Sequence, residues 1–106
     1  MSQTPQPNPV AFVTSEFADD PDFAELLAEF VPEMSVRRDH LQKAYEAGEF
    51  AEVGRLAHQL KGAGSGYGFP ELTEKAAIVE QAARSTDRST LQFVLDDLVS
   101  YLERIR

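Results

Sequence analysis

Apolar residues recur at helical spacing along the first long segment of the chain, from residue 23 to residue 45. At about 100° per residue they fall within one stripe roughly 100° wide, made up of Phe23, Leu26, Leu27, Phe30, Met34, Leu41, Ala44 and Tyr45. Arg37 is the one polar residue in the stripe. Because the stripe keeps its phase across Pro32, it predicts one long helix with a kink near Ala28. Asp20-Pro21 supplies an N-cap with proline at the first helical position, and Gly48 supplies the stop.

The same spacing predicts three further helices. The second runs from about Phe50 to a point between Gly64 and Tyr67, and the third opens at Pro70. The third helix has a short apolar face of Leu72, Ala76, Val79 and Ala83. Turn and cap residues at 85–87 then precede a fourth helix, whose apolar face is formed by Leu91, Val94, Leu95, Leu98, Leu102 and Ile105. No segment has the alternation typical of a strand.

The residues before the first long helix divide into two parts. Residues 1–9 are rich in Pro, Gln and Asn and have little to bury, so we expect a disordered tail or the remnant of a linker. Residues 10–106 form the folded domain, which opens with a short helical turn carrying Val10, Phe12, Val13 and Phe17. Short connections between amphipathic helices favour antiparallel neighbours. The predicted fold is therefore all-α: an up-and-down antiparallel four-helix bundle with a short additional N-terminal helix.

Composition and charge narrow the function. The chain has 106 residues, a formal net charge of -8 and no Cys, which argues for one domain and against disulfides or thiolate metal sites. The negative charge disfavours nucleic acid and anionic lipid as partners. No apolar run approaches the roughly 20 residues that span a bilayer, and the first residues lack a signal peptide's features. We expect a cytoplasmic monomer whose partners are proteins.

His58 is the residue that suggests chemistry. With His58 at 0° on a helical wheel, the apolar side chains of the second helix lie at about 140° to 220°, namely Val53, Leu56, Leu60, Ala63 and Tyr67. The imidazole therefore points away from the core. Its neighbours, all within about 60° of its direction, are Gly54, Arg55, Lys61, Gly62 and Ser65.

An exposed imidazole can act as a nucleophile near neutral pH, since its unperturbed pKa is about 6.5. Lys61, one turn further on, can offer an ammonium group to phosphoryl oxygens. Gly62 leaves space where a larger side chain would block the approach of another protein. Glycine in a helix interior is destabilising, so its presence favours either a functional role in docking or a role in helix packing.

The run His58-x-Leu60-Lys61-Gly62, followed by Ala63-Gly64-Ser65-Gly66-Tyr67-Gly68, resembles the signature of histidine-containing phosphotransfer domains. The resemblance implies that His58 is the phosphoacceptor, that Lys61 assists the phosphoryl group, and that Gly62 clears a docking path. It also implies exchange of phosphate with an aspartate of a response-regulator receiver domain and with a sensor histidine kinase, hybrid kinases included. Magnesium and most catalytic groups then belong to the receiver, so this chain would be a relay with no cofactor and no catalytic activity of its own. Gly54, Arg55, Ser65 and Gly62 would border the docking surface.

Two other functions stay open: a helical bundle that binds a signalling protein without accepting phosphate, and a fragment of a larger sensor kinase. His40 lacks lysine and glycine at the matching offsets, so we interpret it as a surface residue. No metal-binding spacing of His is present, and the glycine run lacks the pattern of a phosphate-binding loop. Gly64 and Gly66 each weaken a helix by roughly 1 kcal/mol relative to alanine, and Tyr67 replaces a more usual aliphatic residue of the family.

Overall fold

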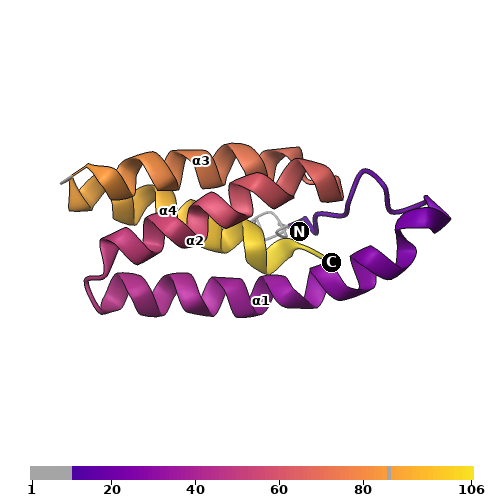
Figure 1. Cartoon of the computed structure of the whole chain (residues 1–106), viewed down its shortest axis with the longest axis horizontal. Helices are drawn as coiled ribbons and strands as arrows, with labels where there is room; N and C mark the ends of the chain where they lie inside the picture. The colour runs from indigo at the N-terminus through magenta and orange to yellow at the C-terminus, as the bar shows by residue number, and fades with distance from the viewer. Residues whose placement is uncertain (1–10, 86) are drawn as a thin grey trace, which may run out of the picture.

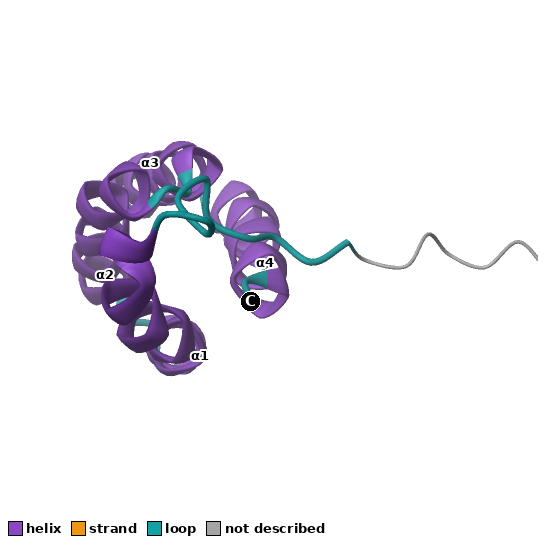
Figure 2. Ribbon diagram, turned by 90° about the vertical axis from the view of Figure 1, so that its right-hand side faces the viewer, coloured by secondary structure: helices purple, strands orange, loops and turns teal. Residues whose placement is uncertain are grey.

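The computed structural model describes residues 11–85 and 87–106, which fold as an up-and-down bundle of four α-helices. Successive helices run in opposite directions (Figure 1). Seen from one end, they follow one another around an arc (Figure 2). The predicted all-α class and four-helix architecture are confirmed by these elements: η1 (Pro21–Phe23), α1 (Ala24–Glu46), α2 (Phe50–Gly64), η2 (Ser65–Tyr67), α3 (Pro70–Arg84) and α4 (Arg88–Arg104).

The helix ends follow the capping residues that the sequence contains. Asp20 accepts a hydrogen bond from the backbone N–H of Asp22 at the start of η1, and Asp87 caps α4 by accepting from the N–H groups of residues 89 and 90. Gly48 and Gly68 have φ angles of 74° and 86°. Only glycine adopts this left-handed conformation readily, so both residues define where the chain turns between helices.

The core lies along the predicted apolar faces. Leu41, Val53, Leu72 and Leu98 are completely buried, and the whole predicted face of α4 is buried or partly buried. Leu26 is the exception, because 47% of it is exposed although it lies in the predicted stripe. None of residues 24–29 is buried, since the first turns of α1 reach past the other helices (Figure 1). The stripe therefore continues beyond the part of the helix that the bundle covers.

α1 continues through Pro32 without interruption, as its unbroken apolar phase predicts. Its N-terminal turns bend away from the line of the rest of the helix (Figure 1). Arg37 is half-buried, and its guanidinium donates a hydrogen bond of 3.0 Å to the side chain of Gln59 on α2. The polar residue in the apolar stripe thus links α1 to α2 at the position next to His58.

The expected short helix near the N-terminus is not formed by the described residues. Instead Val13 makes an isolated parallel β-bridge with Ile105, and the Ser15 hydroxyl donates to the carbonyl of Tyr67 at 2.6 Å. The N–H of Glu16 donates to the Gly68 carbonyl. Residues 16–19 form a turn and not a helix. Partners from distant parts of the fold satisfy backbone groups that a helix would otherwise pair. The predicted tail, residues 1–9, lies outside the described residues.

Gly64 lets α2 and α3 pack closely, and α2–α3 is the most extensive helix pair. A Cβ added at Gly64 would lie 2.6 Å from the Thr73 hydroxyl and 2.8 Å from its backbone nitrogen, a distance that real Cβ atoms do not adopt. A Cβ at Gly54 would make an ordinary contact of 3.5 Å with Ala83. Gly64, which weakens the helix locally, is therefore required by the packing of α3 against α2.

Candidate functional site

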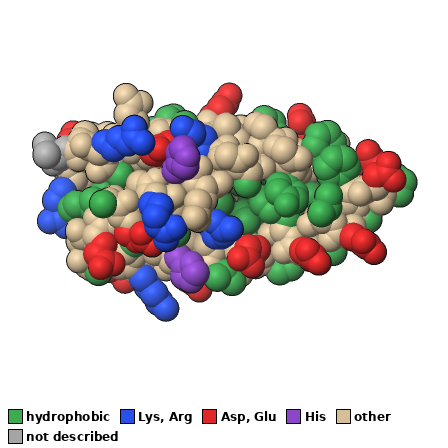
Figure 3. Space-filling view, viewed as in Figure 1, with side chains coloured by type: hydrophobic (Ala, Val, Ile, Leu, Met, Phe, Trp, Pro, Cys, Tyr) green, Lys and Arg blue, Asp and Glu red, His purple; other side chains and the backbone are tan. Residues whose placement is uncertain are grey.

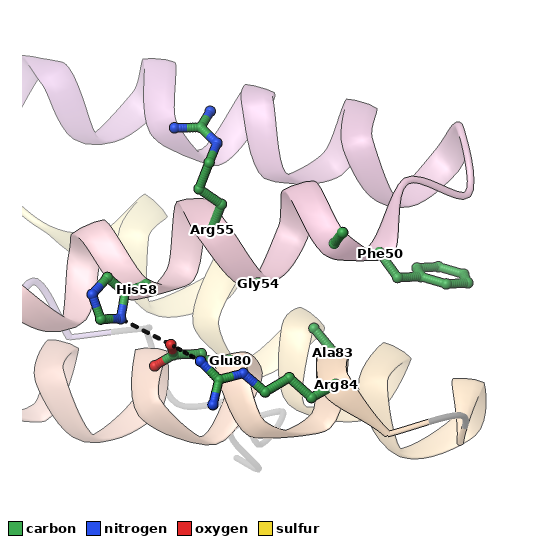
Figure 4. A pocket seen from close by; sticks show the side chains of 8 residues that line it. Phe50, Gly54, Arg55, His58, Glu80, Ala83 and Arg84 are labelled. Carbon is green, nitrogen blue, oxygen red and sulfur yellow. Dashed lines mark hydrogen bonds and ion pairs between the residues drawn. The ribbon is translucent and has the colours of Figure 1, made fainter.

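His58 lies near the middle of α2 on the side away from the core. Its side chain is 64% exposed, whereas Ala57 and Leu60, on the opposite side of the helix, are buried. The helical spacing predicts this orientation correctly. Figure 4 shows the imidazole above the junction between α2 and α3, turned toward a side chain that rises from α3.

That side chain is Glu80, which joins His58 and two cations. Its Oε2 atom is 2.8 Å from Nδ1 of His58 and 2.9 Å from Nη2 of Arg84. Its other oxygen, Oε1, is 2.8 Å from Nζ of Lys61. One carboxylate therefore contacts a histidine and a lysine on α2 and an arginine one turn along its own helix.

Glu80 is a buried carboxylate in an otherwise exposed site, since only 7% of its side chain is accessible. Burial alone would favour its protonated form. The hydrogen bond from Lys61 is the largest influence in the other direction, and together with the hydrogen bond from His58 it lowers the pKa of Glu80 below its usual range. The carboxylate is thus ionised at neutral pH, and its charge is compensated by neighbouring donors.

The contact with Glu80 determines which nitrogen of His58 carries the proton. An ionised carboxylate can only accept hydrogen bonds, so Nδ1 must be the donor. In the neutral imidazole the lone pair then lies on Nε2. No hydrogen bond to Nε2 from the described residues is present. The nitrogen that carries the lone pair is therefore the one that Glu80 does not contact, on a side chain that is largely exposed.

Lys61 and Arg84 differ in exposure although they contact the same carboxylate. The side chain of Lys61 is 38% exposed and that of Arg84 is 76% exposed. Both long side chains can leave Glu80 by rotating about their flexible stems. The site therefore has two cations close to the imidazole in addition to the group that orients it.

The other predicted site residues lie at different distances from His58 and in different surroundings. Gly62 is exposed, and a Cβ built there would meet nothing within 4 Å. Gly54 and Arg55 line a hollow beside His58, but the guanidinium of Arg55 is paired with Glu52 through two hydrogen bonds. Ser65 is two turns from His58, and its hydroxyl and backbone N–H bond to Thr73.

The hollow beside His58 lies between α2 and α3 and has a volume of about 530 Å3. Its lining includes the small residues Gly54 and Ala83 together with Arg55 and Arg84. Figure 4 shows Arg84 turned toward Glu80 and Arg55 turned away from α3. On the face shown in Figure 3, the Lys and Arg side chains gather around the histidines. This local excess of positive groups contrasts with the net charge of the whole chain, and it suits an anionic ligand or protein surface.

Glu80 and Arg84 are the site residues that the sequence interpretation misses. A signal for Glu80 does exist, because it lies at about 100° from Val79 and about 60° from Ala83 on the wheel of α3. A carboxylate at the edge of an apolar stripe must find donors on a neighbouring helix or stay in water. The sequence alone does not say which donors those are.

Among the described residues, no group of three or more His, Cys, Asp or Glu is placed to hold a metal ion. Within the same part of the chain, none of the helices combines the length and the apolar character needed to cross a membrane.

The fold and the site together define a class: a helical bundle that presents on an outer helix face an exposed imidazole held by a buried carboxylate. The chain belongs to the Hpt domain family, whose model matches residues 25–106. Comparison with curated proteins and with solved structures gives no match. The matched region begins in α1 and contains the whole bundle together with His58, Glu80 and both cations. Membership of this family implies a part in histidine phosphotransfer in two-component signalling, as the resemblance of residues 57–68 indicated.

Proposed function

We propose that the chain is a phosphorelay intermediate that carries a phosphoryl group on Nε2 of His58. The observation that carries this proposal is the contact between Nδ1 of His58 and Glu80. It holds the imidazole in the tautomer whose lone pair faces solvent, on a helix face with no bulky neighbour at Gly62. A nucleophile in this position can be reached by another protein without any movement of the bundle.

The phosphoryl donor and acceptor on this proposal is an aspartate of a receiver domain. The Nε2 lone pair forms the new N–P bond while the P–O bond of the aspartyl phosphate breaks and the carboxylate leaves. The ring becomes positively charged, and Glu80 stabilises that charge through the proton on Nδ1, as a carboxylate behind a catalytic histidine does. The reverse reaction returns the group to a receiver.

Lys61 and Arg84 are the cations that can move from Glu80 to bind the phosphoryl group. Both lie on Glu80 before transfer, and an anionic phosphoryl group on Nε2 would compete with that carboxylate for them. Magnesium belongs to the receiver, and this chain supplies the nucleophile, its orientation and a docking face. The chain then acts as a carrier and not as an enzyme.

The test is phosphorylation of the purified chain by phosphorylated receiver domains. We expect labelling of the native chain that is stable to alkali and labile to acid, as a phosphoramidate is, and no labelling of His58→Gln. Thermal unfolding of that variant should match the native chain because the side chain is exposed. Labelling that persists in His58→Gln, or an acid-stable phosphate on Ser65, would identify a different acceptor. Binding of receivers without labelling would favour a pure interaction module.

A further inference from the structure

Cations from three helices lie on the face of the bundle that presents His58. They come from α1, α2 and α3, and they are Arg37, Lys43, Arg55, Lys61 and Arg84. These residues are half of the ten Lys and Arg of the chain, although the formal net charge of the chain is -8. In Figure 3 the Lys and Arg side chains gather around the histidines. A partner that docks over His58 therefore meets a surface more positive than the rest of the molecule.

Arg55 is a cation of this face that the chemistry at His58 does not use. Lys61 and Arg84 both lie on Glu80, within reach of a phosphoryl group on the imidazole. Arg55 begins one turn before His58 on α2, and Figure 4 shows its side chain turned away from α3. Its guanidinium is therefore placed to contact something other than the phosphoryl group.

Glu52 occupies the guanidinium of Arg55 in the free chain. Nε and Nη2 of Arg55 each donate to a different carboxylate oxygen of Glu52, which is the bidentate geometry that these two groups prefer. The two residues lie one turn apart on the same helix, and both side chains are accessible to solvent. An ion pair of this kind contributes little to stability because water competes for both charges. Another carboxylate can therefore replace Glu52 without disturbing the bundle.

Arg55 lies where a docked protein would touch it. It lines the hollow that contains His58, and it also lines a second hollow, on the side of α1, that contains His40 and Lys43. Lys43 is exposed and forms no ion pair within the part of the chain that the structure describes. An acidic side chain brought to this position would meet Arg55 with a second cation beside it, whereas a basic side chain would be repelled.

We propose that Arg55 selects the receiver domain by binding a carboxylate on its docking surface, and that Glu52 is the internal competitor that this carboxylate displaces. This recognition rests on the proposed phosphorelay function and adds the chemistry by which the partner is chosen. In the complex the guanidinium exchanges one bidentate carboxylate for another, and Glu52 is left in water. A receiver with a neutral or basic side chain at this place leaves the Arg55–Glu52 pair intact and gains no contact. Charge pairing of this kind determines specificity and the rate of association.

The probe is the receiver domain that binds the native chain most tightly in a panel of purified receivers. Its affinity is measured by calorimetry, and its transfer rate is measured at saturating concentration after phosphorylation with acetyl phosphate. Arg55→Gln should weaken the affinity by about fivefold or more, while the saturated rate and the lifetime of the phosphohistidine stay native. Arg55→Lys keeps the charge without the bidentate geometry, so its affinity should be intermediate. Arg38→Gln is the matched control, because Arg38 is also paired with a neighbouring carboxylate but lies near Glu103 on α4.

Removal of the competitor should have the opposite effect. Glu52→Gln should strengthen receiver binding, because the guanidinium is then free before the receiver arrives. Asp39→Asn removes the same charge beside Arg38, so it measures the effect of net charge alone. The gain of Glu52→Gln over this control should disappear when Arg55→Gln is combined with it, since Glu52 acts through Arg55. Thermal unfolding of all these variants should stay near the native temperature, since the changed side chains are on the surface.

The outcomes separate this recognition from the proposed function. Equal loss of affinity in Arg55→Gln and Arg38→Gln would mean that only net charge attracts the receiver. Equal affinity of Glu52→Gln and Asp39→Asn would mean that no exchange of carboxylates takes place. A shorter phosphohistidine lifetime in Arg55→Gln at native affinity would assign Arg55 to the phosphoryl group. Failure of the bound receiver to label His58 would overturn the relay function, whereas an affinity that still depends on Arg55 would support the recognition.

Discussion

Nδ1 of His58 and Oε2 of Glu80 lie 2.8 Å apart across the junction of α2 and α3, although the two residues are separated by 22 positions in the chain. The histidine is largely exposed and the glutamate is almost completely buried. The bundle therefore holds the carboxylate rigidly and uses it to orient a ring that solvent and partners can reach. An exposed side chain gains a fixed orientation from this arrangement without being enclosed in a cleft.

Glu80→Gln should change the chemistry of His58 more than the stability of the bundle. The amide has nearly the same shape, but it has no negative charge to hold the proton on Nδ1 or to stabilise a cationic ring. We expect the nitrogen NMR shifts of His58 to report a mixture of the two tautomers in place of one. Phosphoryl acceptance should slow by tenfold or more. A native tautomer ratio in the variant would show that Glu80 does not orient the ring.

The pH dependence of stability follows from the lowered pKa of Glu80. Lys61 and His58 hold that pKa below the value of about 4.3 expected in an unfolded chain. Glu80 therefore contributes stability that is fully present above the unfolded pKa and is lost as the pH falls through the folded pKa. Urea unfolding of the native chain and of Glu80→Gln should give a stability difference at pH 7 that disappears under strongly acidic conditions. A difference that is constant with pH would contradict the ion-pair assignment.

Lys61→Ala should slow transfer from one fixed donor and shorten the life of the phosphohistidine by several-fold, without abolishing either. A partly exposed cation beside a phosphoryl group contributes modestly. Arg84→Ala is the matched control, because it removes a cation from the same carboxylate but at a more exposed position, and its effect should be smaller. If Lys61→Ala equals the native chain in rate and lifetime, the lysine serves only to neutralise Glu80.

Gly62 and Gly64 should respond in opposite ways to substitution. Gly62 faces open space, so Gly62→Gln should unfold near the native temperature but transfer phosphate poorly in both directions, since its side chain projects into the path of a receiver. Gly64→Ala should destabilise the fold by about 1 to 3 kcal/mol, because the added methyl group meets Thr73 and the Phe69 carbonyl. Thermal unfolding and transfer rates measured on both variants separate the docking role of Gly62 from the packing role of Gly64. Transfer at the native rate by Gly62→Gln would exclude docking of a receiver over this face.

Ser15→Ala tests how much the segment of residues 13–17, which packs across the end of the bundle, contributes to stability. The buried hydroxyl donates to the Tyr67 carbonyl and accepts from the N–H of Phe17, so its loss leaves two backbone groups without a partner. We expect destabilisation of about 1 to 3 kcal/mol in urea unfolding and unchanged phosphoryl transfer. Thr14→Ala, at an exposed neighbouring position, should have little effect on either. Equal free energies of unfolding of the two variants would mean that the hydrogen bonds of Ser15 do not stabilise the fold.

Helical periodicity predicts most of the fold. In the site it predicts the orientation of His58 but not its contact with Glu80. It places His58 opposite the buried face of α2 and gives the limits of α2, α3 and α4 closely. It cannot assign Glu80, because the partner of a residue at the edge of a stripe depends on how two helices are rotated against each other. It also extends the covered face of α1 too far, to Leu26, since a pattern within one helix contains no information on where its neighbours end.

The same limitation explains the N-terminal segment. Its apolar residues are compatible with a helical turn, but the pairing of Val13 with Ile105 joins positions from opposite ends of the fold. Local sequence contains no trace of such a contact. The role of Gly64 is similar, since its cost to α2 is visible in the sequence whereas the compensating approach of Thr73 is a property of the assembled pair.

The bridge between Val13 and Ile105 has a topological consequence. The N–H of Val13 donates to the Arg104 carbonyl and the N–H of Arg106 donates to the Val13 carbonyl, each at 2.9 Å, so the two ends of the described fold lie side by side. A short linker could join them without crossing the bundle. A circular permutant opened at the tight connection around Gly48 should therefore keep the helix order in space. It would carry His58 close to its new N-terminus, on an otherwise unchanged α2.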